Sequence, residues 1–93
     1  MRNFSNLSKS IFKGNNLVDV DFIGADLTFS DLSDTNMSHA NLSDANLSDA
    51  NLSDANLTGA NLSGANLQGA ILDNTILTDA NLKCVNHQIC ESG

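Results

Sequence analysis

The sequence predicts a solenoid repeat protein built from sixteen consecutive five-residue units that run from Ser5 to Cys84. Two observations lead to this prediction. Large apolar residues recur at every fifth position without a break, and mostly small residues stand two places before them. The composition is rich in Leu, Asn, Ala, Ser and Asp, which is also typical of disorder, but a disordered chain has no reason to keep a strict apolar spacing.

The central apolar residue of each unit belongs to the predicted core. On an α-helix a step of five residues turns the side chain by about 140°, so these residues would spiral around every face. On a flat strand an odd spacing would place successive members on opposite faces. The chain must therefore bend within each unit so that all of them reach a common interior. The predicted core consists of Leu7, Phe12, Leu17, Phe22, Leu27, Leu32, Met37, Leu42, Leu47, Leu52, Leu57, Leu62, Leu67, Leu72, Leu77 and Leu82.

The other positions of the unit favour a tight bend. The residue two before the centre is Ala in nine units, and the residue directly before it is Asn or Asp in thirteen of sixteen. Mostly Ser or Thr and then Asp or Gly follow the centre. Asn and Asp side chains tolerate turns and bond to nearby backbone, or they form ladders with copies above and below. Each unit is therefore expected to contain a turn.

Units such as Ala40–Asp44, Ala45–Asp49 and Ala60–Gly64 resemble the A(D/N)LXX motif of the pentapeptide-repeat family. The resemblance covers residues 5–84. It implies an all-β fold, a right-handed quadrilateral parallel β-helix in which four units form one coil and the central Leu or Phe points inward. Sixteen units then correspond to about four coils.

The ends of the repeat divide the chain into three parts. Residues 1–4 form an N-terminal lead-in, residues 5–84 the β-helix, and residues 85–93 a C-terminal tail that begins where His87 occupies the next expected Leu position. Phe12 and Phe22 are expected to plug the interior from opposite faces of the first coil. Ile89 is expected to cover the last Leu layer, so that the tail acts as a cap. No helix pattern covers the N-terminal end, which leaves it available for self-association.

The charge and hydropathy of the chain exclude several classes of partner. Eleven acidic and four basic residues give a net charge of −7, which argues against binding to nucleic acid or to an anionic membrane surface. No apolar run suits a signal peptide or a membrane span, so the cytoplasm is the default expectation.

Three residues near the C-terminus are weak candidates for metal ligands, namely Cys84, His87 and Cys90. Thiolate and imidazole suit Zn²⁺, but a tetrahedral structural site needs a fourth donor that this spacing does not supply. A Cys84–Cys90 disulfide and two free thiols are the alternatives. We therefore expect no metal and no cofactor.

Catalysis is not expected either. None of the many serines has a partner residue for nucleophilic chemistry, and the two histidines, His39 and His87, fall in different coils. Leu side chains fill the interior, so convergent polar groups in a cavity are missing. The sequence predicts a protein that is not an enzyme.

Departures from the repeat point to a surface. Stacking residues twenty apart places Asp34 over Asp54, the one directly stacked pair of acids in the columns of turn residues. Ile71 and Ile76 replace outward Asn or Asp on adjacent faces, and Phe29 takes another outward position. These apolar residues suggest a contact surface for a partner or a second copy. Scattered exposed apolar residues are also normal, and distributed acids keep such a fold soluble.

The sequence thus favours a non-catalytic structural or protein-interaction module. Its partner is an unidentified protein, or another copy that associates through an end of the solenoid. The residues expected to form the interaction surface are Ile71, Ile76, Phe29, Asp34 and Asp54. The alternative, which the resemblance implies through its gyrase-interacting members, is an acidic DNA mimic that acts on DNA gyrase or topoisomerase.

Overall fold

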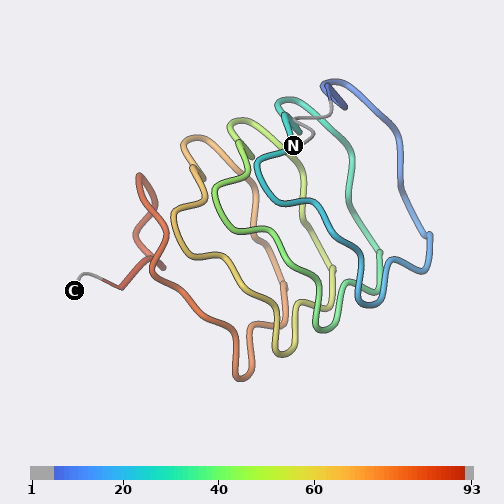
Figure 1. The fold of residues 1–93 in the computed structure, drawn as a ribbon. Coiled ribbons are helices and arrows are strands. Elements are labelled where there is room, and N and C mark those ends of the chain that lie inside the picture. The colour runs from blue at the N-terminus through green and yellow to red at the C-terminus, as the bar shows by residue number, and fades with distance from the viewer. Residues whose placement is uncertain (1–5, 92–93) are drawn as a thin grey trace.

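The computed structural model describes residues 6–91, in which the chain winds around a single axis and successive turns lie side by side (Figure 1). Ser5, the lead-in 1–4 and residues 92–93 lie outside the described part. Thirteen isolated parallel β-bridges run from Asn6↔Asp26 to Asn66↔Val85, and all but the last join residues twenty apart. One turn therefore takes four five-residue units, in agreement with the prediction. Within residues 6–91 the pairing consists of single bridges, without helices or continuous strands.

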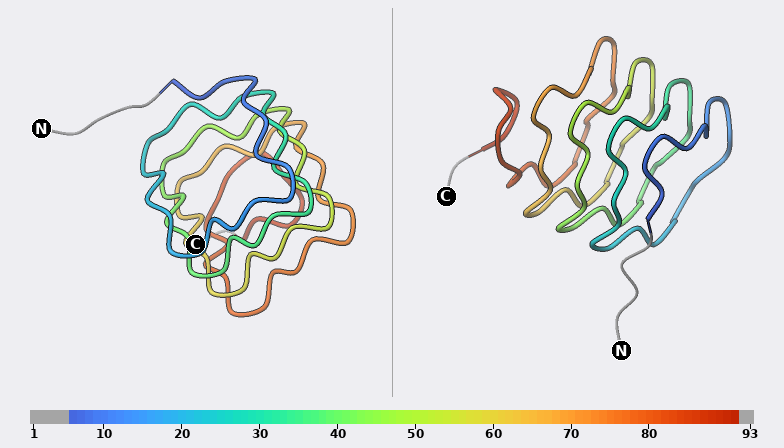
Figure 2. Two further views of the ribbon diagram at one scale, coloured as in Figure 1. Left: turned by 90° about the vertical axis from the view of Figure 1, so that its right-hand side faces the viewer. Right: turned by 90° about the horizontal axis from the view of Figure 1, so that it is seen from above.

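Four units per turn give the solenoid four sides, and the view along its axis has a four-sided outline (Figure 2, left). We name each side by its column of bridged residues. Face 1 contains Asn6, Asp26, Asn46 and Asn66; face 2 contains Ile11, Asp31, Asn51 and Ile71; face 3 contains Asn16, Asn36, Asn56 and Ile76; face 4 contains Asp21, Asn41, Asn61 and Asn81.

The backbone of an internal unit has an acceptor for every N–H group. In Ala40–Asp44, the first residue donates back across the bend at 3.0 Å and the second donates to the preceding turn at 2.9 Å. The third and fifth residues donate to the following turn at 2.8 Å. The N–H of Ser43 donates to Oδ1 of Asn41 at 3.1 Å. Each turn is thus joined to both neighbours, and the unit leaves no buried donor unpaired.

The Asn or Asp before the core residue supplies the fifth acceptor throughout. All thirteen such side chains accept the N–H two residues later, at 2.9–3.2 Å. The predicted bond between these side chains and nearby backbone is therefore confirmed. Among the described residues, the three units with isoleucine at this position lack the bond.

The last residue of every unit except the one that ends at Cys84 adopts a positive φ. In fifteen units this angle lies between 58° and 77°, as the third residue of a type II turn requires. Gly, Asn and Asp adopt this conformation most easily, which explains why they dominate the position. Lys9, Phe29 and His39 are the exceptions.

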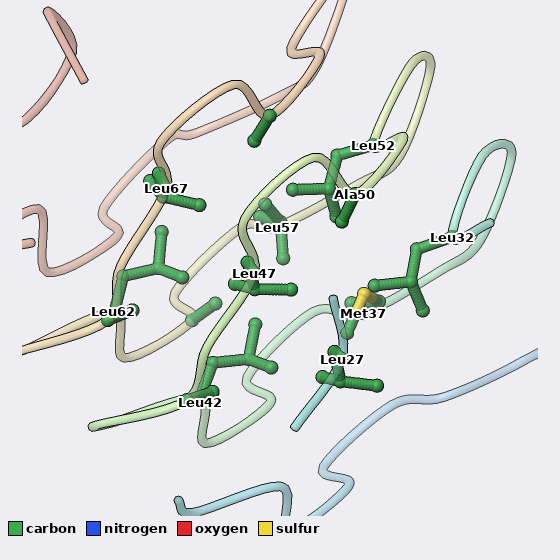
Figure 3. Close-up of a cluster of buried hydrophobic side chains, with 14 of the residues drawn as sticks. Leu27, Leu32, Met37, Leu42, Leu47, Ala50, Leu52, Leu57, Leu62 and Leu67 are labelled. Atoms are coloured by element: carbon green, nitrogen blue, oxygen red, sulfur yellow. The ribbon is translucent and has the colours of Figure 1, made fainter. Parts of the chain in front are cut away.

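The core is a single column of side chains along the axis. Nine central residues, from Leu27 to Leu67, have no exposed surface, and Figure 3 shows them pointing into the interior. Seven others at the two ends, among them Phe12, Phe22 and Leu77, are partly buried against this column. All sixteen predicted core residues thus belong to the interior or pack against it.

The register changes at the C-terminal end. The last bridge, Asn66↔Val85, spans nineteen residues, so one residue is missing from the final bend. As a result Cys84 lies where the repeat would place a small residue, and it is buried with 6% exposure. An unbroken five-residue period would place Cys84 in an outward column of turn residues, but the shortened bend rotates its side chain inward.

The tail folds back over part of this end. Cys84 and Cys90 form a disulfide with their Cα atoms 5.0 Å apart, and the N–H of Glu91 donates to the carbonyl of Leu82 at 2.7 Å. Ile89 packs against the core, as predicted. The tail therefore covers the end at face 1 and face 4.

Candidate interaction surface

The twenty-residue register places four of the five predicted surface residues along face 2. Phe29 lies at the corner between faces 1 and 2, while Asp34 and Asp54 are stacked at the corner between faces 2 and 3. Ile71 lies on face 2 itself. Ile76 lies on face 3, next to the same corner. Phe29 and Ile71 thus lie along the same side of the molecule, although they are 42 positions apart in the sequence.

The apolar members of this group are well exposed. The exposed fraction is 62% for Phe29, 44% for Ile71 and 48% for Ile76. Phe29 also has a φ of 60°, a left-handed conformation that costs a residue with a side chain about 1–2 kcal/mol. Phe29 therefore combines an exposed aromatic ring with a strained backbone, and neither feature is explained by the packing of the core.

Charged residues on face 2 interact across turns. Nζ of Lys13 lies 3.1 Å from Oδ2 of Asp34 on the next turn, and both side chains are exposed. The hydrogen bond from Lys13 to Asp34, followed by their charge attraction, raises the pKa of the Lys13 amine. The hydroxyl and then the N–H of Ser33 donate to the carboxylate of Asp31, and these bonds lower the pKa of Asp31.

Sequence reasoning missed the pairing of Lys13 with Asp34. The two residues are twenty-one positions apart, so the twenty-residue register alone would have placed them on neighbouring turns. It also passed over Val85, which is 46% exposed on the extension of face 1. The outward position of Val85 depends on the residue that is missing from the last bend, and the repeat does not predict that loss.

The proposed ligands at the C-terminal end do not form a metal site in this structure. Two of the three weak metal candidates, Cys84 and Cys90, are joined in the disulfide, and Nδ1 of His87 accepts the N–H of Ile89 at 3.3 Å. Between residues 6 and 91 no group of three or more His, Cys, Asp or Glu side chains is placed to hold a metal ion.

The two histidines lie apart. The ring of His39 rests over Gly59 on the next turn, where a Cβ would approach its Nδ1 to 2.6 Å. His87 lies in the tail, beside Ile89. In the described part of the chain, one buried side-chain polar atom has no hydrogen-bond partner, the hydroxyl of Ser30. Among residues 6–91 no helix has the length and apolar character that crossing a membrane requires.

Comparison with known proteins identifies the repeat. The family model described as pentapeptide repeats (8 copies) matches residues 3–28, 16–54 and 60–86. A pentapeptide repeat protein from Nostoc PCC 7120, solved at 1.7 Å, is 32% identical with a TM-score of 0.68, over 87% of this chain and 69% of that chain. No curated protein matches the chain significantly in sequence.

Two further structures define how far the similarity extends. A pentapeptide repeat protein from the thylakoid lumen of Arabidopsis thaliana is 33% identical with a TM-score of 0.51, over 83% of this chain and 61% of that chain. QnrB1, a plasmid-mediated fluoroquinolone resistance protein, has a TM-score of 0.63 but only 15% identity, over 86% of this chain and 52% of that chain. That similarity shows the fold alone. Structures of this family are right-handed quadrilateral β-helices, and the chain described here belongs to the pentapeptide-repeat family.

Proposed function

We propose that this protein is a non-catalytic protein-interaction module that binds a protein partner through face 2 and the two corners that border it. The solenoid, of about four coils, provides a rigid flat side. Phe29 and Ile71 supply the apolar contacts, Asp34 and Asp54 supply the acidic ones, and Ile76 extends the surface around the corner.

The observation that carries the proposal is the conformation of Phe29. Its position takes Gly, Asn or Asp in most other units, because these residues adopt a positive φ at little cost. A bulky exposed ring there costs free energy without contributing to the core. Strained, exposed residues of this kind gather at binding sites, and aromatic side chains are enriched at the centres of protein interfaces.

The compartment forms a second part of the proposal. Disulfides persist in oxidising compartments and are rare in the cytosol. The Cys84–Cys90 bond therefore favours an oxidising compartment over the cytoplasm that the sequence suggested.

Affinity capture from an extract of the native cells, with quantitative mass spectrometry, tests the surface. We expect one or more proteins to be retained by the wild-type chain and lost with Phe29→Asn and with the double variant Ile71→Asp/Ile76→Asp. An interface centre of this kind loses about 2 kcal/mol or more on such a change, which is about thirtyfold in affinity.

Val85→Asp is the matched control. Val85 is as exposed as Ile71 and lies at the same end of the solenoid, but on the extension of face 1. The control should retain the partner. The proposed surface is wrong if all three variants capture the same proteins as the wild type.

A further inference from the structure

The C-terminal end of the solenoid is open along faces 2 and 3. In each internal turn, the core residue and the last residue of a unit donate their N–H groups to the following turn. In the last turn the corresponding groups on these two faces are the N–H groups of Leu72, Asn74, Leu77 and Asp79. Within residues 6–91 none of the four has an acceptor.

Two substitutions enlarge this set of open donors. Ile71 and Ile76 stand where thirteen other units have an Asn or Asp that accepts the N–H two residues later. Without that side chain, the N–H groups of Asp73 and Thr78 also lack an acceptor in the described structure. The rim therefore presents six backbone donors, beside two exposed isoleucines and the half-buried Leu72 and Leu77.

The chain itself covers the rest of this end. Val85 pairs in parallel with Asn66 at face 1, and Glu91 donates to Leu82 at face 4. The disulfide holds this segment in place, and in Figure 1 the red tail lies beyond the last turn. The tail, which pairs through Val85 alone and then turns at residues 86–89, thus covers half of the rim, while the other half is bare. Because the tail lies beyond the last turn at faces 1 and 4, a complete coil of another solenoid cannot approach this end as closely as neighbouring turns approach each other.

We propose that the rim formed by residues 70–79 binds an extended segment of a partner protein by parallel strand addition. Its backbone carbonyls accept the open N–H groups, as successive turns do inside the solenoid. Strand addition of this type takes its affinity from main-chain hydrogen bonds and its specificity from alternate side chains. Unprotected strand edges otherwise tend to pair with other chains, and natural proteins cover them.

The columns of the repeat define the chemistry of that segment. A residue stacked on Ile71 should be apolar, the next one should be apolar and fill the gap above Leu72, and the third should be basic because it stacks on the exposed Asp73. Asp79 adds a second exposed carboxylate at the same rim. The first turn of this chain contains the same pattern in Ile11-Phe12-Lys13.

A synthetic peptide with the sequence of residues 10–17, acetylated and amidated, serves as the probe. NMR spectra of the isotope-labelled protein should show shifts of the amide signals of Leu72, Asn74 and Leu77 on addition of peptide, and slower hydrogen exchange at these amides. A peptide with Lys13→Glu should bind about threefold more weakly, as expected for loss of an exposed charge pair.

The protein variant Ile71→Asn/Ile76→Asn restores the repeat consensus, so it should fold at least as well as the wild type while it binds the peptide about threefold more weakly or worse. Ile11→Asn makes the same change at the opposite rim and should leave binding unaltered. Phe29→Asn should also leave it unaltered, which separates this site from the surface on face 2.

Three results would overturn the inference. The amides of the rim could fail to shift at millimolar peptide, or the Ile71→Asn/Ile76→Asn variant could bind as well as the wild type. The same amides could also become protected without peptide as the protein concentration rises, in which case the occupant is a second copy.

Discussion

Phe12 and Phe22 meet inside the first turn, with ring centroids 5.7 Å apart and planes tilted by 52°. They approach from faces 2 and 4, and both pack against the core. Two rings at this distance close the interior at a level where smaller side chains would leave it open. Aromatic pairs with tilted planes contribute about 0.5–1.5 kcal/mol beyond the area that they bury.

The pairing predicts a coupled loss of stability. Phe22→Ala should lower the free energy of unfolding by about 2–3 kcal/mol, less than for a fully buried Phe because the ring is only half-buried. A double-mutant cycle with Phe12→Ala, measured by urea unfolding, should give a coupling of about 1 kcal/mol. Phe29→Ala makes the same chemical change on an exposed ring and should cost little. Equal losses for Phe22→Ala and Phe29→Ala would contradict the role of the first pair.

The backbone of Phe29 predicts a stabilising substitution. Asn tolerates a positive φ much better than Phe, so Phe29→Asn should raise the free energy of unfolding by up to about 1 kcal/mol. Phe29→Ala removes the same ring but keeps the strain, and therefore should not produce this gain. Thermal unfolding of the two variants side by side provides the measurement. A Phe29→Asn protein no more stable than Phe29→Ala would contradict the backbone strain at this position.

Removal of a side-chain acceptor in a bend should lower the free energy of unfolding. Oδ1 of Asn46 accepts both the N–H and the hydroxyl of Ser48, at 3.0 and 2.7 Å. Asn46→Ala leaves that N–H without an acceptor and should destabilise the protein by about 1 kcal/mol. Asn46→Asp keeps the acceptor and is the control. Chemical denaturation should separate the two; identical midpoints for Asn46→Ala and the wild type would show that water replaces the side chain at no cost.

The carboxylate of Asp31 predicts a dependence of stability on pH. Its pKa is lowered in the folded protein by bonds from the hydroxyl and the N–H of Ser33. A lowered pKa means that Asp31 stabilises the fold above about pH 4, the ordinary range of an Asp, and that this contribution is lost as the pH falls through the folded value. Ser33→Ala removes the hydroxyl and should move the pKa of Asp31 back towards its ordinary value. NMR titration of the side-chain carbon of Asp31 measures the change, and an unaltered titration midpoint would refute it.

The disulfide predicts a dependence on reducing agent. Cys84 and Cys90 are six residues apart, and closing a loop of that size stabilises a fold by about 2 kcal/mol in the chain-entropy description. Reduction should therefore lower the unfolding midpoint and expose the tail to hydrogen exchange, beginning at Glu91. The variant Cys84→Ala/Cys90→Ala should show no further response to reductant. A wild-type protein with the same midpoint in both conditions would mean that the tail docks without the bond.

Much of the fold could be predicted from the repeat because each unit has the same local requirements, an inward apolar residue and a bend with its own hydrogen-bond acceptor. An apolar residue at every fifth position has no place on a helix or a flat strand, and the Asn or Asp before Leu47 or Leu52 supplies the acceptor that a bend requires. The interior column, the bends and the polar exterior all follow from these local rules. The number of units per turn did not follow from the period and came from the family resemblance.

Two features were decided by the tertiary structure. The loss of one residue from the final bend turned Cys84 inward and brought it to Cys90, whereas the spacing alone also allowed free thiols and, as a weak candidate, a metal ligand set. The gathering of Phe29, Asp34, Asp54 and Ile71 along one side depends on the twenty-residue turn, which sets residues from different units next to one another. The sequence by itself determined a stack of bent units with an apolar interior, because that information is local. Which surface residues become neighbours, and which backbone donors stay open at the rim, was determined only when the turns stacked, because both depend on contacts between units far apart in the chain.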